Sequence, residues 1–129
     1  MSAPATRYSA TVRSHFRSLA GAGDLPPAAG AAVSGEAVAL DRLAWVRFAV
    51  RIDAGRIVDC RFRAFGCPHT LAAASLVAGR LRGAPIDALP AFDAGTLACE
   101  LDAPAEKMGR LLVVEDALRH LLANAHRVQ

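Results

Sequence analysis

One stretch, residues 55–83, constrains the fold of this chain more than any other, because it predicts a strand, a sharp bend and a helix in immediate succession. Between Ile57 and Phe65, apolar and polar side chains alternate with a period of two, which is typical of a strand with one buried face. The apolar face would hold Val58, Cys60, Phe62 and Ala64, and the polar face Asp59, Arg61 and Arg63. Gly66 then permits a sharp bend, and Pro68 suits the first position of a helix, where a missing N–H costs no hydrogen bond.

The bend brings one thiol, that of Cys67, to the start of the expected helix. Unpaired amide donors and the positive end of the helix dipole favour a thiolate at such a position, so Cys67 is the chain's best candidate for chemistry. His69 lies two residues later and could be a partner for this thiol. Its side chain leaves the helix in a different direction, however, and we expect an exposed histidine in the first helical turn.

The remaining patterns predict one α+β domain over residues 1–129, with a three-stranded antiparallel sheet packed by helices. Strands are expected over residues 34–40, 45–53 and 56–65, and a tight turn at Ala54-Gly55 joins the last two. A first helix would carry Tyr8, Val12, Phe16 and Leu19 on its apolar side, and further helices are expected over residues 68–82, 85–89, 93–101 and 104–125. Residues 1–7 should form a loose arm and residues 20–32 a flexible connection.

The composition is typical of a compact protein that works in water. A chain of 129 residues makes one domain, and a hydrophobic content of 53% is enough to build a core. No apolar stretch is long enough to cross a bilayer, and the amino terminus lacks the apolar core of a signal peptide, so we expect neither membrane insertion nor export. The three cysteines form no CxxC pair and are odd in number, which predicts a reduced, cytoplasmic protein.

The net charge of +3 comes from 14 arginines and a single lysine that are spread along the chain. Four of these, Arg47, Arg51, Arg61 and Arg63, would share the polar face of the predicted hairpin. Such a face could bind nucleic acid or an acidic partner, but it lacks the interleaved aromatic residues on which single-stranded nucleic acid stacks. We therefore do not expect a nucleic acid partner, and we interpret these arginines as a solvated sheet face.

Several short motifs in this chain occur together, at similar spacings, in a known family. They are Tyr8-Ser9, Gly55 in a hairpin, Phe65-Gly66-Cys67, Ser75-Leu76-Val77 with Gly83, and Glu115-Asp116-Ala117. On these motifs the chain resembles the scaffold proteins of iron-sulfur cluster assembly, namely the IscU proteins and the NifU amino-terminal domains. The resemblance covers most of the chain. It implies the α+β fold described above and a scaffold-like role in cluster assembly that is not enzymatic.

The resemblance also implies a ligand set, and here the sequence departs from the family. Family scaffolds hold a cluster or zinc with three cysteines, an aspartate two residues after the first cysteine, and a histidine just before the third. Only the second cysteine is present, as Cys67. The first cysteine aligns with Arg42, the aspartate with Ala44, the histidine with Gly109 and the third cysteine with Arg110. A shifted alignment would bring in Asp41, but no shift supplies a cysteine.

These departures predict that the chain alone does not hold a cluster or zinc in stoichiometric amount. Such sites need several soft or borderline ligands at one point, whereas Cys60 and Cys99 are expected to pack rather than to coordinate. Arg42 and Arg110 cannot lose a proton to bind a metal, and they would favour a thiolate or a small anion if both point inward. They would otherwise extend into solvent. A metal at Cys67 would then require ligands from a partner.

The resemblance implies a partner in the assembly pathway, such as a cysteine desulfurase that Cys67 could engage or from which it could receive sulfur. The family's LPPVK segment, which a chaperone recognises, corresponds to residues 103–107, where Glu106 places a charge; chaperone docking is therefore not expected. An alternative is a non-catalytic binding or regulatory module that kept the scaffold fold. A thiol enzyme that uses Cys67 with Arg42 or Arg110 lacks a recognisable general base.

Overall fold

A computed structural model describes residues 9–18, 21–87, 89 and 92–127 of the chain. Its elements in chain order are α1 (Ala10–Ser18), β1 (Ala31–Ala39), the 3₁₀ turn η2 (Leu40–Arg42), β2 (Ala44–Asp53), β3 (Arg56–Phe65), α2 (Pro68–Leu81), α3 (Ala94–Leu101), the 3₁₀ turn η3 (Ala105–Lys107) and α4 (Met108–Arg127). The predicted α+β class is therefore confirmed. The predicted arm, residues 1–7, lies outside the described residues.

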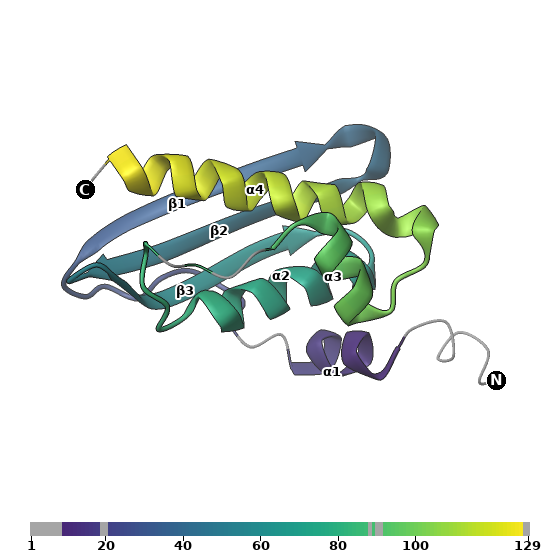
Figure 1. The fold of residues 1–129 in the computed structure, drawn as a ribbon, viewed down its shortest axis with the longest axis horizontal. Coiled ribbons are helices and arrows are strands. Elements are labelled where there is room, and N and C mark those ends of the chain that lie inside the picture. Colours follow the sequence, from purple (N-terminus) through teal and green to yellow (C-terminus); the bar gives the residue numbers. More distant parts are fainter. Residues whose placement is uncertain (1–8, 19–20, 88, 90–91, 128–129) are drawn as a thin grey trace.

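The three strands form one antiparallel sheet in the order β1-β2-β3 (Figure 1). The tight turn between β2 and β3 was expected at Ala54-Gly55, and these two residues have φ values of 52° and 74°. Positive φ at both central residues is the type I′ geometry, whose twist matches that of a hairpin. The predicted strands are confirmed, although β1 begins at Ala31 rather than at residue 34.

A β-bulge in β3 changes the face that its first residues occupy. Arg51 pairs with Asp59 and Ile52 with Ile57, so Val58 is an extra residue in the ladder. In consequence Ile57 is fully buried, whereas Val58 is 49% exposed. The prediction that Val58 lies on the apolar face is wrong, because a strict period of two cannot anticipate an inserted residue.

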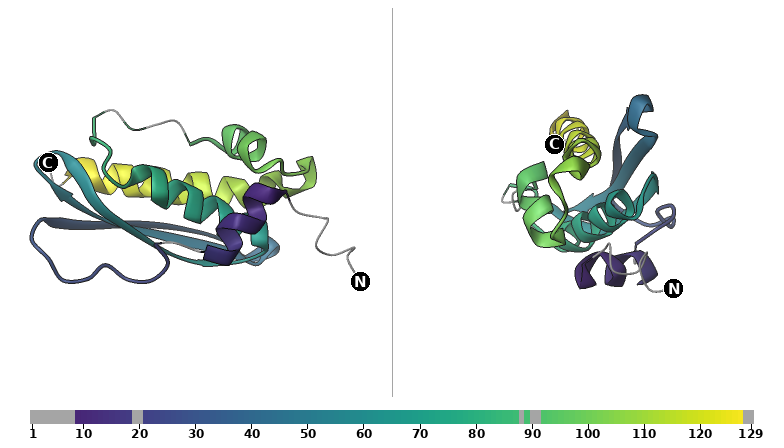
Figure 2. Two further views of the ribbon diagram at one scale, coloured as in Figure 1. Left: turned by 90° about the horizontal axis from the view of Figure 1, so that it is seen from below. Right: turned by 90° about the vertical axis from the view of Figure 1, so that its right-hand side faces the viewer.

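Helices α2 and α4 cover one face of the sheet, and residues 21–30 run over the other face (Figure 2). α4 packs mainly on β1 and β2, α2 packs on β3, and α1 packs against α2. The buried layer between sheet and helices includes Val46, Phe48, Val50, Cys60, Phe62, Val77, Leu111 and Leu121. Among the described helices, none has both the length and the apolar character needed to cross a membrane.

α4 approaches β1 most closely at Gly35. A Cβ atom placed on Gly35 would lie only 2.1 Å from the backbone of α4. This close approach lets two α4 side chains bond to the outer edge of β1. Asn124 Nδ2 donates to the carbonyl of Ser34 at 2.8 Å, and His120 Nδ1 accepts from the N–H of Glu36 at 3.0 Å. These bonds occupy backbone groups of an edge strand that would otherwise be open to another chain.

The helix expected over residues 85–89 is absent from the described part of that segment. Pro85 instead forms an isolated antiparallel bridge with Arg56, and the N–H of Ile86 donates to the carbonyl of Gly55 at 2.8 Å. The segment after α2 therefore pairs with the start of β3. A long-range pairing of this kind overrides the local helical preference on which the prediction rested.

Within the predicted flexible connection, residues 20–32, the structure shows paired segments: residues 21–23 pair with β3, and residues 31–32 belong to β1. Ala22 forms a parallel bridge with Phe62: the N–H of Phe62 donates to the carbonyl of Gly21, and the N–H of Gly23 donates to the carbonyl of Phe62, both at 2.9 Å. This segment thus covers part of the outer edge of β3 before it crosses the sheet.

Candidate functional site

The predicted bend between β3 and α2 is confirmed, and it presents Cys67 at the start of α2. Cys67 is the N-cap residue, with φ −74° and ψ 168°. Gly66 has φ +154°, and a Cβ atom there would crowd the side chain of Thr70 at 3.0 Å, so the bend requires glycine. The Cys67 side chain is half-buried, and its Sγ lies 3.7 Å from the hydroxyl oxygen of Thr70.

Two of the positions implied by the resemblance, Arg42 and Ala44, lie where β1 passes into β2. Strand pairing brings this connection to the same end of the molecule as Cys67, because Trp45 pairs with Phe65 (Figure 1). Ala44 is 2% exposed at the start of β2. Arg42 belongs to η2, and its side chain lies outside the part of the chain that the structure describes.

The other two positions, Gly109 and Arg110, lie half-buried in the first turn of α4. His69 is also buried, at 1% exposure, so the prediction of an exposed histidine is wrong. Burial lowers the pKa of His69 below its ordinary value of 6.5, and the positive charges of Lys107 and Arg110 lower it further. The first turn of α2 is therefore covered by the start of α4, an arrangement that helix geometry alone could not reveal.

The buried His69 predicts a loss of stability in mild acid. Because its pKa is lowered in the folded state, the unfolded chain takes up the proton first as the pH falls below about 6.5. The stabilising contribution of neutral His69 is thus complete above that pH and is lost as the pH falls through the folded-state pKa. Urea unfolding should be compared at about pH 7.5 and about pH 5.5. The loss in the free energy of unfolding between these two pH values should be smaller for His69→Gln than for the native protein. The exposed His126 provides the control, because His126→Gln should keep the native pH dependence.

The donors at this end of the molecule do not fit a cluster or a structural zinc ion. Among the described residues, no three His, Cys, Asp or Glu side chains come together as a metal site. Cys60 is fully buried in the core and Cys99 is exposed on α3, so neither lies with Cys67. Such sites take about four converging ligands, commonly cysteine thiolates. A single thiol such as that of Cys67 can take part in exchange or transfer chemistry.

The three cysteines should differ sharply in reactivity. Burial raises the pKa of the Cys60 thiol to about 12, so almost none of it is thiolate in the folded protein. At mildly alkaline pH, we expect iodoacetamide to modify Cys60 at least about a hundredfold more slowly than Cys99. Peptide mass spectrometry after timed quenching measures both rates. In urea the two rates should converge, and equal rates in the folded protein would contradict the buried position of Cys60.

Two residues at this end were not singled out from the sequence. Thr70 places its hydroxyl oxygen 3.7 Å from the thiol of Cys67, because residues three apart at the start of a helix lie close together. Lys107 was noted only within the segment aligned with the chaperone motif, yet its charge acts on His69. Nothing in the local sequence pattern indicates that contact, since it depends on how α4 packs against α2.

The chain was also compared with known protein sequences. The model of the family described as NifU-like N terminal domain matches residues 7–127. The iron-sulfur cluster assembly scaffold protein IscU of Escherichia coli strain K12 is 33% identical over 72 residues, which make up 56% of this chain and 56% of that protein. The chain thus spans about half the length of the curated relatives it matches.

Solved structures with the same fold have low sequence identity. A candidate iron-sulfur cluster assembly scaffold protein for the SUF system from thermophilic Fervidobacterium islandicum AW-1 has a TM-score of 0.70 at 16% identity, covering 91% of this chain and 97% of that chain. A nitrogen-fixing NifU-like protein (N-terminal) from Brucella abortus has a TM-score of 0.64 at 14% identity, covering 94% and 95%. Together with the family match over residues 7–127, these findings show that the chain belongs to the family of NifU-like N-terminal domains.

Proposed function

We propose that this chain is a scaffold-like protein of iron-sulfur cluster assembly that accepts sulfur at Cys67 and does not hold a cluster by itself. The observation that carries this proposal is the half-buried thiol of Cys67 at the bend between β3 and α2. The chain belongs to the scaffold family, yet its other aligned ligand positions include Ala44, Gly109 and Arg110. Several thiolates are needed to hold a cluster, whereas one thiolate is enough to accept a sulfur atom.

A cysteine desulfurase that carries sulfur as a persulfide could deliver it in one exchange. The Cys67 thiolate would attack the terminal sulfur, a new S–S bond would form, and the desulfurase cysteine would leave as a thiolate, so neither oxidant nor reductant is consumed. The product on Cys67 is an anion. Lys107 and Arg110 place positive charge near His69, two residues after Cys67, and a persulfide anion is stabilised where such charge lies close by. Free cysteines suit this exchange, and we place it in the reducing cytoplasm.

Exposed apolar side chains at the Cys67 end support a protein partner there. Leu40 and Leu43, on the connection between β1 and β2, are 80% and 69% exposed, and Phe65 is 62% exposed two residues before Cys67. Large apolar side chains that gather on a surface often mark an interaction site. A desulfurase that docks on this end would bring its persulfide to Cys67. Glu106 is exposed in η3, and chaperone docking at that segment stays unexpected.

Sulfur transfer to Cys67 can be measured directly. The purified chain is incubated anaerobically with a cysteine desulfurase and cysteine, alkylated, and analysed by mass spectrometry. We expect the mass of one sulfur atom to be added at Cys67, and the addition to fall to background in Cys67→Ser. Cys99→Ser is the matched control and should still accept sulfur. Equal labelling of Cys99 and Cys67 would contradict a specific acceptor.

A second candidate is a binding or regulatory module that occupies assembly partners without accepting sulfur. The exposed apolar residues Leu40, Leu43 and Phe65 favour it, because a docking surface needs no ligands and no reactive thiol. The same experiment separates the two candidates. A desulfurase that copurifies equally with the native chain and with Cys67→Ser, while neither gains sulfur, would support the module.

A further inference from the structure

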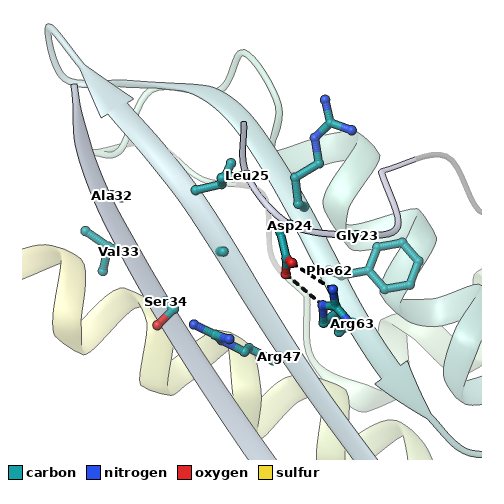
Figure 3. A pocket seen from close by; sticks show the side chains of 11 residues that line it. Gly23, Asp24, Leu25, Ala32, Val33, Ser34, Arg47, Phe62 and Arg63 are labelled. Carbon is teal, nitrogen blue, oxygen red and sulfur yellow. Dashed lines mark hydrogen bonds and ion pairs between the residues drawn. The ribbon is translucent and has the colours of Figure 1, made fainter. Parts of the chain in front are cut away.

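A pocket lies on the face of the sheet opposite α2 and α4, between the strands and the segment formed by residues 21–30. Its volume is about 480 Å³, which suits a small molecule. Figure 3 shows the side chains that line it. The charged side chains that line it are Arg47 from β2, Arg61 and Arg63 from β3, and Asp24 from the covering segment. Among the described residues that line the pocket, three therefore carry a guanidinium group and one carries a carboxylate.

The covering segment is fixed to the sheet at two places, so the pocket is largely preformed. Near β3, backbone hydrogen bonds join residues 21–23 to Phe62. Further along, Arg51 is only 8% exposed and donates from Nη2 to the carbonyl of Pro26 at 2.8 Å and from Nη1 to that of Ala28 at 2.9 Å. A pocket whose walls are already ordered loses little entropy when a ligand binds.

Strand register places like charges side by side in this pocket. Arg47 lies directly opposite Arg63 in the β2–β3 ladder, and such a pair is unfavourable without an anion between its members. Asp24 provides one anion, but both of its oxygens are bound by Arg63, each at 2.7 Å. Glu36 lies opposite Arg47 on β1 and accepts a hydrogen bond from Trp45 Nε1 at 2.7 Å.

Arg47 is consequently the guanidinium that is available to a ligand. It is exposed and makes no hydrogen bond to any residue that the structure describes. Arg61 is half-buried two pairs further along the ladder, opposite Ala49, and its Nε lies 3.2 Å from the carboxylate of Asp59. Guanidinium groups bind phosphate and carboxylate oxygens in a two-pronged geometry, so the pocket is suited to either group.

We propose that the pocket binds a small polyanion that carries phosphate or carboxylate groups. Arg47 and Arg61 make the main contacts, and Arg63 shares its charge between the ligand and Asp24. The sheet face that the sequence suggested to be merely solvated is thus a ligand site, and it lies along the same strand that leads to Cys67. A small ligand is favoured over a nucleic acid, because residues 21–30 cover part of the arginine-bearing face.

Isothermal titration calorimetry with inorganic pyrophosphate and with citrate, at physiological ionic strength, tests this proposal and separates phosphate from carboxylate ligands. Arg47→Gln and Arg61→Gln should each lower the affinity for the tighter-binding probe about tenfold, because each substitution removes a charge-assisted hydrogen bond. Asp24→Asn should instead tighten binding several-fold, since it frees Arg63 for the ligand.

Two exposed residues of α4 supply controls with the same changes of net charge. Arg119→Gln and Asp116→Asn should leave the affinity unchanged, and all variants should keep the native melting temperature. The proposal would be overturned if neither probe gave a heat of binding. It would also be overturned if the pocket variants bound the probes with the same affinity as the α4 controls. A single-stranded oligonucleotide that binds without competition from either probe would also overturn it, since the charge would then serve a nucleic acid.

Discussion

A variant that combines Arg42→Cys, Ala44→Asp, Gly109→His and Arg110→Cys is expected to bind zinc and to retain a reconstituted iron-sulfur cluster, whereas the native chain should retain neither in stoichiometric amount. The changes remove two permanent positive charges and supply the family's ligands around Cys67. Zinc at about a thousand times its dissociation constant would stabilise the folded variant by about 4 kcal/mol. Thermal unfolding with and without zinc, and visible absorbance after anaerobic reconstitution, measure the two effects.

The matched control for this gain of function is the same variant with Cys67→Ser added. It keeps two new thiols but loses the one that the bend presents, so zinc stabilisation and the chromophore should both be largely lost. The native chain provides a second comparison. If the native chain formed a stable chromophore that vanished in Cys67→Ser, the predicted inability of the single thiol to hold a cluster alone would be wrong.

Replacing Gly35 by alanine should be among the most damaging single changes in the core. The new Cβ atom would lie 2.1 Å and 2.5 Å from the backbone N and Cα of Leu121, and a helix backbone cannot yield as a side chain can. α4 would have to move off β1, which also strains the bonds from Asn124 to Ser34. We expect a loss of about 3–5 kcal/mol, combining overpacking with the weakened hydrogen bonds. Urea unfolding followed by circular dichroism measures it.

Gly79 is the matched control for this substitution. It is exposed within α2, and a Cβ atom placed there would meet nothing within 4 Å. Gly79→Ala should therefore raise the free energy of unfolding by about 1 kcal/mol, because alanine favours a helix more than glycine does. If Gly35→Ala changed stability by less than about 0.5 kcal/mol, the close approach of α4 to β1 would be contradicted.

Local signals in the sequence were sufficient for most of the secondary structure. The positive-φ turn at Ala54-Gly55 and the bend at Gly66 depend on backbone preferences that act within a few residues. Asp93 is the first residue of the helix expected over residues 93–101, and its carboxylate caps α3 by accepting a hydrogen bond from the N–H of Thr96 at 2.7 Å. These features could be predicted because each needs only its immediate neighbours in the chain.

Two of the errors arose where a distant segment determined the local structure: Pro85 bridges to Arg56, and His69 is buried where α4 packs against α2. The third, the exposure of Val58, comes from an inserted residue within the β2–β3 hairpin. Periodicity describes one element at a time. The periodicity of one element does not show which other element packs against it. The free energy of that packing exceeds the weak local preferences for helix or strand.

For the candidate site, the sequence by itself determined which donor atoms are available: it contains Cys67 and lacks the other family cysteines, and no folding can supply a missing thiol. Only the tertiary structure decided which charges lie near His69, two residues after that thiol, and which oppose each other across the sheet. Lys107 and Arg110 act on His69 because α4 packs against α2, and Arg47 faces Arg63 because two strands pair in one register. Side-chain chemistry is carried by single residues, whereas electrostatic environment depends on distances that only the packed chain establishes.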